Sequence, residues 1–178
     1  MKINTPSKIV KLKLAFGVSL RKAKIQDAKL LLRIHNNSVK MGFFNSKDLI
    51  TLKEHIKWLR KKINSSSKIY IGRDLKKKDF GYVRFDKVKN NIFEVSIGNL
   101  PSFYGKGLGT LMLEKAIKKF KMNYKTKKII SVVKKSNTRS MKCFLKNGFV
   151  KTNFNEKKHS TINKINQKIE NYFELKTV

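Results

Sequence analysis

The first regular pattern in the chain is an alternation of apolar and polar or small residues from position 10 to position 21. Apolar side chains occupy the even positions, as in a strand that buries one face. Gly17 lies inside this run, where a glycine is typical of a bend or an interruption. We therefore expect residues 1–17 to form an N-terminal extension or an extra strand, with regular structure from about residue 18.

Two segments with helical spacing follow. Residues 25–36 place apolar side chains and His35 on one side, and Asn36-Asn37 is expected to end this helix. Thr51 and Glu54 have the spacing of a capping box, which predicts that a second helix begins there. Apolar residues then recur at helical intervals up to the polar run 64–67, namely Leu52, Ile56, Leu59 and Ile63.

The remaining pattern alternates between strands and helices. Three short β-rich runs, 68–73, 80–86 and 92–97, are separated by polar turns at 74–79 and 87–91. A broad apolar face predicts a helix over 108–120. A strand at 128–133, a helix at 137–147 stopped by Gly148, and strands at 149–154 and 169–177 complete the pattern, with polar residues 155–168 before the last one. Without an internal repeat or a boundary, 178 residues predict one domain.

Composition adds a large positive charge. The formal net charge is +32, and 37 of the 43 basic residues are lysine. Such a charge favours anionic ligands and is compatible with a nucleic-acid-binding module that has no catalytic activity. However, the lysines are spread along the whole chain, and Lys, Asn, Ile and Phe share AT-rich codons. Genome composition therefore explains the bias without a specific nucleic-acid partner.

Other classes are disfavoured. The single cysteine, Cys143, excludes a disulfide framework and gives no metal cluster, and its apolar neighbours predict a small core residue. No apolar run reaches the ~18 residues of a membrane span, and no signal peptide is recognisable. We expect a cytoplasmic protein without membrane contact.

The segment Gly105-Lys106-Gly107-Leu108-Gly109-Thr110 lies between a predicted strand and a predicted helix. Glycine permits positive φ and close approach of the backbone to a ligand, and amides at a helix start bind phosphate groups. The spacing does not match a P-loop, because Lys106 is followed by Gly107. It also lacks the third glycine of a dinucleotide fingerprint, whose place is taken by Thr110. Another phosphate-containing ligand is therefore indicated.

Two motifs identify a family resemblance. Val95–Tyr104 followed by the glycine turn resembles the GNAT acyltransferase pattern of Gln or Arg, two residues, Gly, one residue, and Gly or Ala. Gly107 and Gly109 fill its glycine places, and Tyr104 stands where Gln or Arg is usual. Asn137, Ser140, Gly148 and Phe149 resemble the second motif, and the resemblance covers roughly residues 18–154. It implies an α/β (α+β) fold with a mixed, mostly antiparallel twisted sheet of about seven strands and about four helices.

The resemblance also implies a cofactor site and chemistry. Acetyl-CoA is the expected co-substrate, and Glu94, three residues before Ile97, is the expected general base, although pairing with a lysine is the alternative. Phe144 occupies the position of a frequent family tyrosine and has no proton to give. The expected cofactor-binding residues are Ile97, Gly98, Asn99, Gly105, Lys106, Gly107, Leu108, Gly109, Thr110 and Asn137, where Asn137 is also suited to capping its helix.

The upstream half resembles GNAT enzymes that acetylate amino-sugar nucleotides in nonulosonic (pseudaminic-type) acid biosynthesis. The resemblance lies in His35-Asn36, Phe44–Ser46, His55–Trp58 and Gly81–Asp86. It implies a primary-amine acceptor on a nucleotide-linked sugar, with His35, Asn36 and Arg84 as candidate acceptor-binding residues. For His55 a structural role is favoured, and Arg84 with Asp86 is equally explained as a surface pair. Acetylation of protein N-termini or lysines is the alternative activity, and a homodimer is left open.

Overall fold

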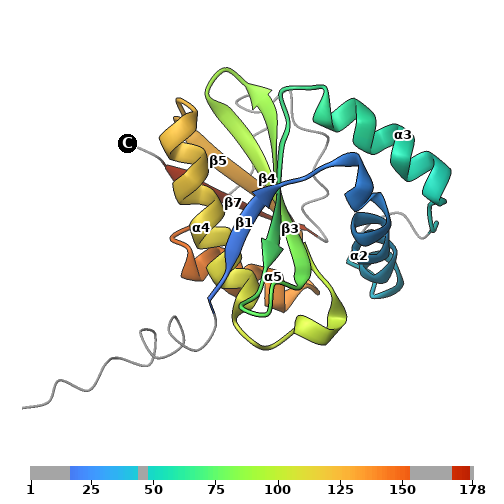
Figure 1. The fold of residues 1–178 in the computed structure, drawn as a ribbon. Helices are drawn as coiled ribbons and strands as arrows, with labels where there is room; N and C mark the ends of the chain where they lie inside the picture. The colour runs from blue at the N-terminus through green and yellow to red at the C-terminus, as the bar shows by residue number, and fades with distance from the viewer. Residues whose placement is uncertain (1–16, 44–47, 153–169, 177–178) are drawn as a thin grey trace, which may run out of the picture.

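The computed structural model describes residues 17–43, 48–152 and 170–176. Seven strands, four α-helices and two short 3₁₀ turns follow one another along the chain (Figure 1). Their bounds are β1 Ser19–Lys22, η1 Ile25–Asp27, α2 Ala28–Lys40, α3 Leu52–Ile63, β2 Lys68–Arg73, β3 Asp79–Lys89, β4 Ile92–Asn99, η2 Pro101–Phe103, α4 Leu108–Asn123, β5 Lys128–Lys134, α5 Thr138–Lys146, β6 Val150–Thr152 and β7 Glu170–Lys176. The predicted class and element order are confirmed.

The strands form one sheet in the order β1-β2-β3-β4-β5-β7-β6. Neighbours are antiparallel except β4 and β5, which run parallel with α4 as the crossover between them, as parallel strands require. The pairing of β4 with β5 joins residues 92–94 to residues 128–130. Beyond this short ladder β4 continues to Asn99 and β5 to Lys134, and their carboxyl ends enclose the cavity described below.

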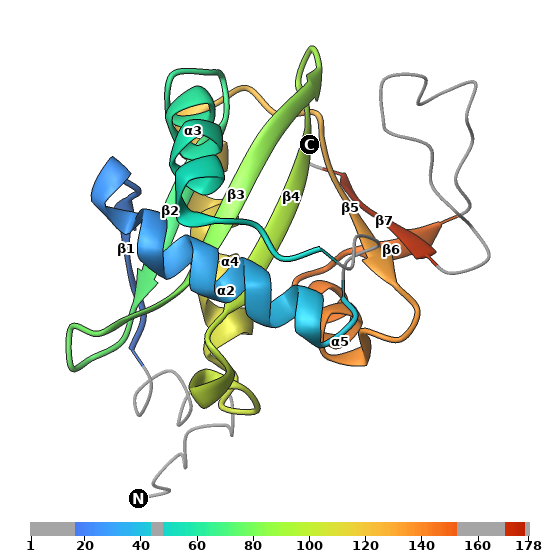
Figure 2. The same cartoon turned by 90° about the vertical axis from the view of Figure 1, so that its right-hand side faces the viewer.

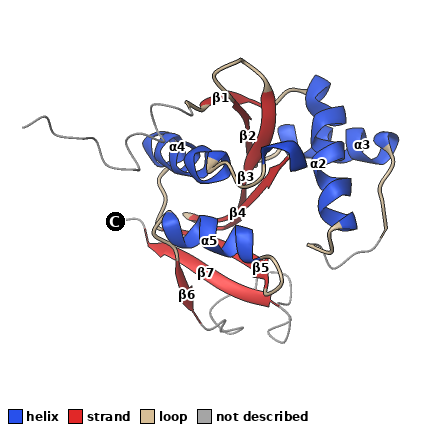
Figure 3. Ribbon diagram, turned by 90° about the horizontal axis from the view of Figure 1, so that it is seen from below, coloured by secondary structure: helices blue, strands red, loops and turns tan. Residues whose placement is uncertain are grey.

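Helices cover both faces of the sheet. In Figures 1 and 3, α4 lies on one side of the β1–β4 strands, and α2 and α3 lie on the other. Two sheet glycines make this close packing possible. A Cβ atom on Gly72 would lie 2.3 Å from the Met112 sulfur of α4, and one on Gly98 would lie 2.7 Å from the Ile34 side chain of α2. Neither position has room for a side chain.

The core under α4 is aromatic. Phe120 stacks on Phe85 of β3 at 4.1 Å between ring centroids and meets the edge of Phe93 of β4 at 4.8 Å. The buried face of α4 comprises Leu108, Met112, Leu113, Ala116, Ile117 and Phe120, which confirms the broad apolar face expected from the sequence. This packing fixes the start of α4, and hence the glycine turn, against the sheet.

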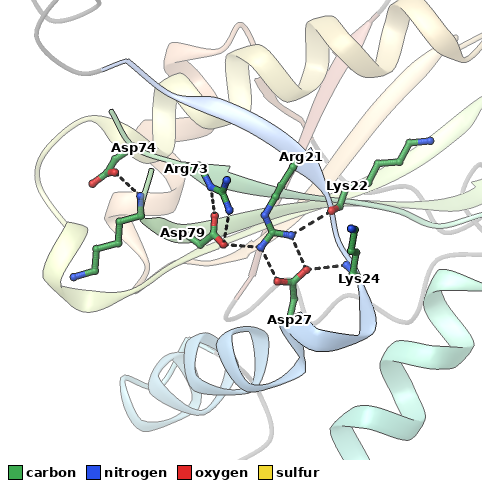
Figure 4. A network of polar contacts seen from close by, with 8 residues as sticks. Arg21, Lys22, Lys24, Asp27, Arg73, Asp74 and Asp79 are labelled. Atoms are coloured by element: carbon green, nitrogen blue, oxygen red, sulfur yellow. Dashed lines mark hydrogen bonds and ion pairs between the residues drawn. The ribbon is translucent and has the colours of Figure 1, made fainter. Parts of the chain in front are cut away.

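An ion-pair network fastens the N-terminal edge of the sheet (Figure 4). The Arg21 guanidinium of β1 donates to Asp27 Oδ1 of η1 and to Asp79 Oδ2 of β3, both at 2.6 Å. Arg73 of β2 also donates to Asp79, at 2.8 Å. Burial alone would raise the pKa of Asp27, but hydrogen bonds from Arg21 and from the Lys24 amide hold that pKa below its ordinary value. The network therefore positions the chain entering α2.

Two predicted boundaries were wrong. The helix expected to end at Asn36-Asn37 continues to Lys40, because Asn36 bonds with its side chain to Ile50 instead of breaking the helix. The loop expected at 87–91 is shorter, since β3 runs to Lys89 and Asn91 alone has positive φ there. Predicted strand residues 10–16, 153–154, 169 and 177, the loop 155–168 and the segment 44–46 lie outside the described residues. Among the helices described, none is both long and apolar enough to cross a membrane.

Candidate functional site

A cavity of about 830 Å³ lies where β4 and β5 are no longer paired. Its walls come from β4 and β5, the glycine turn, the first half of α5, and the facing sides of α2 and α3. This volume is within the range of small-molecule and cofactor sites. The cavity therefore joins the predicted cofactor loop at one end to the predicted acceptor residues at the other.

The glycine turn has the backbone that its sequence requires. Gly105 and Gly107 have φ of +74° and +73°, and Gly107 is the N-cap of α4. A Cβ atom on Gly109 would lie 2.7 Å from Asn99 Nδ2, so glycine also allows the turn to pack against β4. Amides in the first turn of a helix lack intrahelical partners. The turn therefore offers a cradle of the kind that binds a pyrophosphate.

Ile97, Gly98 and Asn99 line the cavity on β4. The Asn99 side chain lies between two glycines, Gly81 and Gly109. Its Oδ1 atom is buried, and the described residues provide no hydrogen-bond partner for it. The strand thus presents its backbone along the path from the glycine turn to the acceptor end, while the Asn99 amide oxygen is buried beside Gly81.

The first turn of α5 forms the opposite wall. Asn137 Oδ1 accepts a hydrogen bond from the Ser140 amide at 3.1 Å, so the predicted capping role is confirmed while the residue also lines the cavity. Phe144 is 1% exposed and packs against Phe149 and Phe173. Cys143 is buried, as predicted, and burial raises the pKa of its thiol to about 11. The thiol is therefore uncharged at neutral pH and is a poor nucleophile.

Two histidines and a tryptophan form the wall at the acceptor end. The His55 ring stacks on the Trp58 ring with 5.0 Å between their centroids. The centroids of the His35 and His55 rings lie 6.4 Å apart. Burial, the neighbouring His35 and the charge of Arg84 lower the pKa of His55 to about 4. Burial and the same charge lower the pKa of His35. Both imidazoles are therefore neutral at pH 7. His55 is the more deeply buried of the two, with 3% of its surface exposed.

Arg84 is the cation at this end. Its Nε donates to Asp86 Oδ2 at 2.6 Å, and its Nη2 lies 3.3 Å from Ser96 Oγ. The guanidinium carbon lies 5.2 Å from the Trp58 ring centroid. The ion pair between Arg84 and Asp86, which was one of two equal interpretations of these residues, is thus present. It holds the guanidinium in a fixed orientation beside the cavity.

Glu94 lies on the same strand and the same face as Ser96, one alternation away, and does not itself line the cavity. Burial raises the pKa of Glu94, and the opposing influence of Arg84 is smaller. A carboxyl group with a raised pKa is a suitable proton acceptor at neutral pH. Its distance along the strand means that contact with an acceptor amine would pass through solvent.

Three further predicted site residues lie off the cavity wall. Lys106 donates from Nζ to the Ser102 carbonyl at 2.8 Å, and Leu108 is a core residue at 3% exposure. Asn36 is engaged at both ends of its amide by Ile50, at 3.0 and 3.2 Å. Asn36 therefore places Ile50, which does line the cavity.

The C-terminal end of α2 reaches across the cavity toward α5. Figure 2 shows α2 crossing in front of β3 and β4 and ending beside α5. Lys134 Nζ of β5 donates to the Gly42 carbonyl at 3.1 Å, and Arg139 of α5 lies 5.4 Å from the Phe43 ring centroid. Sequence reasoning missed Phe43 and Arg139 as cavity residues. The position of Arg139 between Asn137 and Ser140 of the second motif was the signal available for it.

Comparison with known proteins agrees with this geometry. Residues 18–150 match the acetyltransferase (GNAT) domain family. The chain belongs to this family, and its classification as a transferase follows. No curated protein matches the sequence at a significant level.

Solved structures share the fold at low identity. A ribosomal-protein-alanine N-acetyltransferase from Brucella melitensis is 17% identical, with 89% of this chain and 99% of that chain covered and a TM-score of 0.73. A spermidine N-acetyltransferase from Vibrio cholerae, in complex with CoA and spermine, is 20% identical, with 89% and 95% covered and a TM-score of 0.71. An N-acetyltransferase from Staphylococcus aureus is 20% identical, with 90% and 98% covered and a TM-score of 0.70. The acetyl-CoA co-substrate expected from the sequence agrees with the family.

Proposed function

We propose that this protein transfers an acetyl group from acetyl-CoA to a primary amine on a nucleotide-linked amino sugar. The observation that carries the proposal is the acceptor end of the cavity. Neutral His35 and His55 lie there with Trp58 and the fixed guanidinium of Arg84. The His35 imidazole can both donate and accept, which suits sugar hydroxyls, whereas both ring nitrogens of His55 are buried behind it. A guanidinium suits a phosphate.

The charges around the cavity support an anionic acceptor over a polyamine. Of the described residues that line it, five are lysine or arginine and two are carboxylates. One of the carboxylates, Glu54, accepts hydrogen bonds from the Thr51 amide and hydroxyl at 2.7 Å. With a net charge of +32 on the chain, a polycation would meet repulsion both on approach and in the cavity.

The shape of the cavity supports a small molecule over a peptide. Gly42 and Phe43, which follow α2, contact Lys134 and Arg139 on the opposite wall. A peptide substrate needs an open groove along which its chain can continue, whereas these contacts bridge two walls of the cavity. Acetylation of protein N-termini therefore remains the second candidate.

Bound acetyl-CoA would supply the acetyl group as a thioester, and the glycine turn with Ile97–Asn99 is suited to hold it. Forming the amide releases one proton from the amine nitrogen. Glu94 is the proposed acceptor of this proton through an intervening water, because burial raises the pKa of its carboxyl group toward neutrality. Phe144 provides no proton for the leaving thiolate, so protonation there falls to solvent.

The decisive experiment is turnover of UDP-linked amino sugars, spermidine and N-terminal peptides by the same preparation. We expect the highest kcat/KM with an amino sugar. Arg84→Met should raise the KM for that acceptor about tenfold to hundredfold, the equivalent of one hydrogen bond to a charged group at about 1.5–3 kcal/mol. Its acetyl-CoA affinity should stay unchanged.

Arg60→Ala is the matched control, because it removes the same charge from an exposed position outside the cavity. Higher kcat/KM for spermidine or for a peptide would refute the proposed acceptor. An Arg84→Met effect no larger than that of Arg60→Ala would refute the role of Arg84.

A further inference from the structure

Arg139 differs from the other arginines near the sheet in having no acidic partner among the described residues. Arg21, Arg73 and Arg84 each pair with an aspartate at 2.6–2.8 Å. Within the described part of the chain no ion pair is found for Arg139. Arg139 contacts the rings of Phe43 and Tyr104 and, at 3.8 Å, the Met41 sulfur.

The position of Arg139 is unfavourable for a cation without a ligand. It occupies the first turn of α5, where the helix dipole repels positive charge. Lys134, Lys142 and Lys146 line the same cavity and add like charge. The Arg139 side chain is exposed, so its N–H groups are accessible to a ligand, and an anion bound beside it would offset this repulsion.

Tyr104 places the guanidinium next to the glycine turn. The Arg139 Cζ atom lies 4.0 Å from the Tyr104 ring centroid, and Tyr104 directly precedes Gly105. A guanidinium that lies on an aromatic face keeps its N–H groups at the edge, where they can reach phosphate oxygens. The ring therefore holds the guanidinium beside the residue that precedes the Gly105–Thr110 turn.

We propose that Arg139 binds the pyrophosphate of the acyl donor and that Tyr104 acts as the positioning residue that orients it. The inference rests on the proposed use of acetyl-CoA, but it is independent of the acceptor. It assigns a side-chain cation to a turn whose own lysine, Lys106, is bonded to the Ser102 carbonyl. A guanidinium can engage two phosphate oxygens together with the turn amides.

The test is calorimetric affinity for CoA, which needs no acceptor and no turnover. Arg139→Ala should weaken CoA binding about tenfold to hundredfold, from the loss of a hydrogen bond to a charged group worth about 1.5–3 kcal/mol. The CoA affinity of Arg139→Lys should lie between those of the wild type and Arg139→Ala, since lysine keeps the charge but lacks the planar guanidinium. The loss should shrink as salt is raised.

Dephospho-CoA locates the contact, because it keeps the pyrophosphate and lacks the 3′-phosphate. We expect Arg139→Ala to lose the same factor for dephospho-CoA as for CoA. Unchanged dephospho-CoA affinity would overturn the pyrophosphate assignment.

Two variants of Tyr104 test the positioning role. Tyr104→Phe keeps the ring and should bind CoA normally, whereas Tyr104→Ala should lose part of the affinity although α5 is untouched. In the Arg139→Ala background, Tyr104→Arg should restore CoA binding by supplying a guanidinium at the start of the turn.

Arg60→Ala removes an equal charge from exposed surface and should stay within twofold of the wild type. Arg139→Ala within twofold of the wild type, or an equal loss in Arg60→Ala, would overturn the inference. These CoA affinities do not depend on which acceptor the enzyme uses. A wrong acceptor assignment would therefore not alter the predicted losses, and the two proposals can fail separately.

Discussion

Replacement of Gly107 by alanine tests whether the left-handed backbone of the glycine turn is needed for ligand binding. Gly107 has φ of +73° and ψ of −7° at the N-cap of α4. An L-residue with a Cβ atom is less stable there by about 1–2 kcal/mol. Because the turn is exposed, the substituted turn can relax before the ligand binds. We therefore expect most of this free energy to appear as lost acetyl-CoA affinity, about 5- to 30-fold.

Gly148→Ala is the matched control. Gly148 has φ of +80° at the end of α5, and an added Cβ would meet only Leu175 Cδ1, at an ordinary contact distance of 3.6 Å. The backbone strain is the same, but Gly148 does not line the cavity. Its effect should appear as a lower melting temperature with unchanged affinity.

The assay is isothermal calorimetry with acetyl-CoA, paired with thermal unfolding of each variant. If Gly107→Ala binds acetyl-CoA within twofold of the wild type while its stability is also unchanged, the positive φ is not required and the cradle argument is refuted. Gly109→Ala is a less specific test of the backbone conformation, because its Cβ would also displace the side chain of Asn99.

Three further outcomes follow from the same structure. Glu94→Gln should reduce turnover ~10²–10⁴-fold with acetyl-CoA affinity retained, and higher pH should recover part of the rate by supplying more free amine; near-wild-type turnover at neutral pH would exclude general-base catalysis. Phe144→Tyr should leave turnover within a few-fold or improve it, and a larger loss would show that the buried ring tolerates no hydroxyl. Arg21→Ala should lower the unfolding free energy by about 2–3 kcal/mol at neutral pH, from hydrogen bonds to charged groups. The pKa values of Asp27 and Asp79 are lower in the folded protein than their ordinary value of 3.8, so both carboxylates stabilise the wild type above that pH. This contribution is lost as pH falls through the lower folded values. In urea unfolding, the difference in unfolding free energy between pH 7 and pH 3 should therefore be smaller for the variant than for the wild type.

Local features were readable from the sequence because their interactions join residues a few positions apart. Thr51 and Glu54 form the predicted capping box, with bonds at 2.7 and 3.3 Å. Asn137 caps α5, and Gly148 takes the positive φ that ends it. Spacing alone therefore fixed helix starts, the helix stop and the glycine turn, and the two motifs together predicted the family.

Tertiary structure decided what those features do together. The chain gives no local signal that β4 and β5 pair over residues 92–94 and 128–130 and then enclose a cavity, since register depends on packing of the whole sheet. Likewise, His55 and Trp58 are neighbours on one turn of α3, but His55 is buried because α3 packs against α2 and β2, and this burial lowers the pKa of its imidazole. The contact between Arg139 and Tyr104 joins two motifs that are distant in sequence, so only the folded chain places a cation beside the glycine turn.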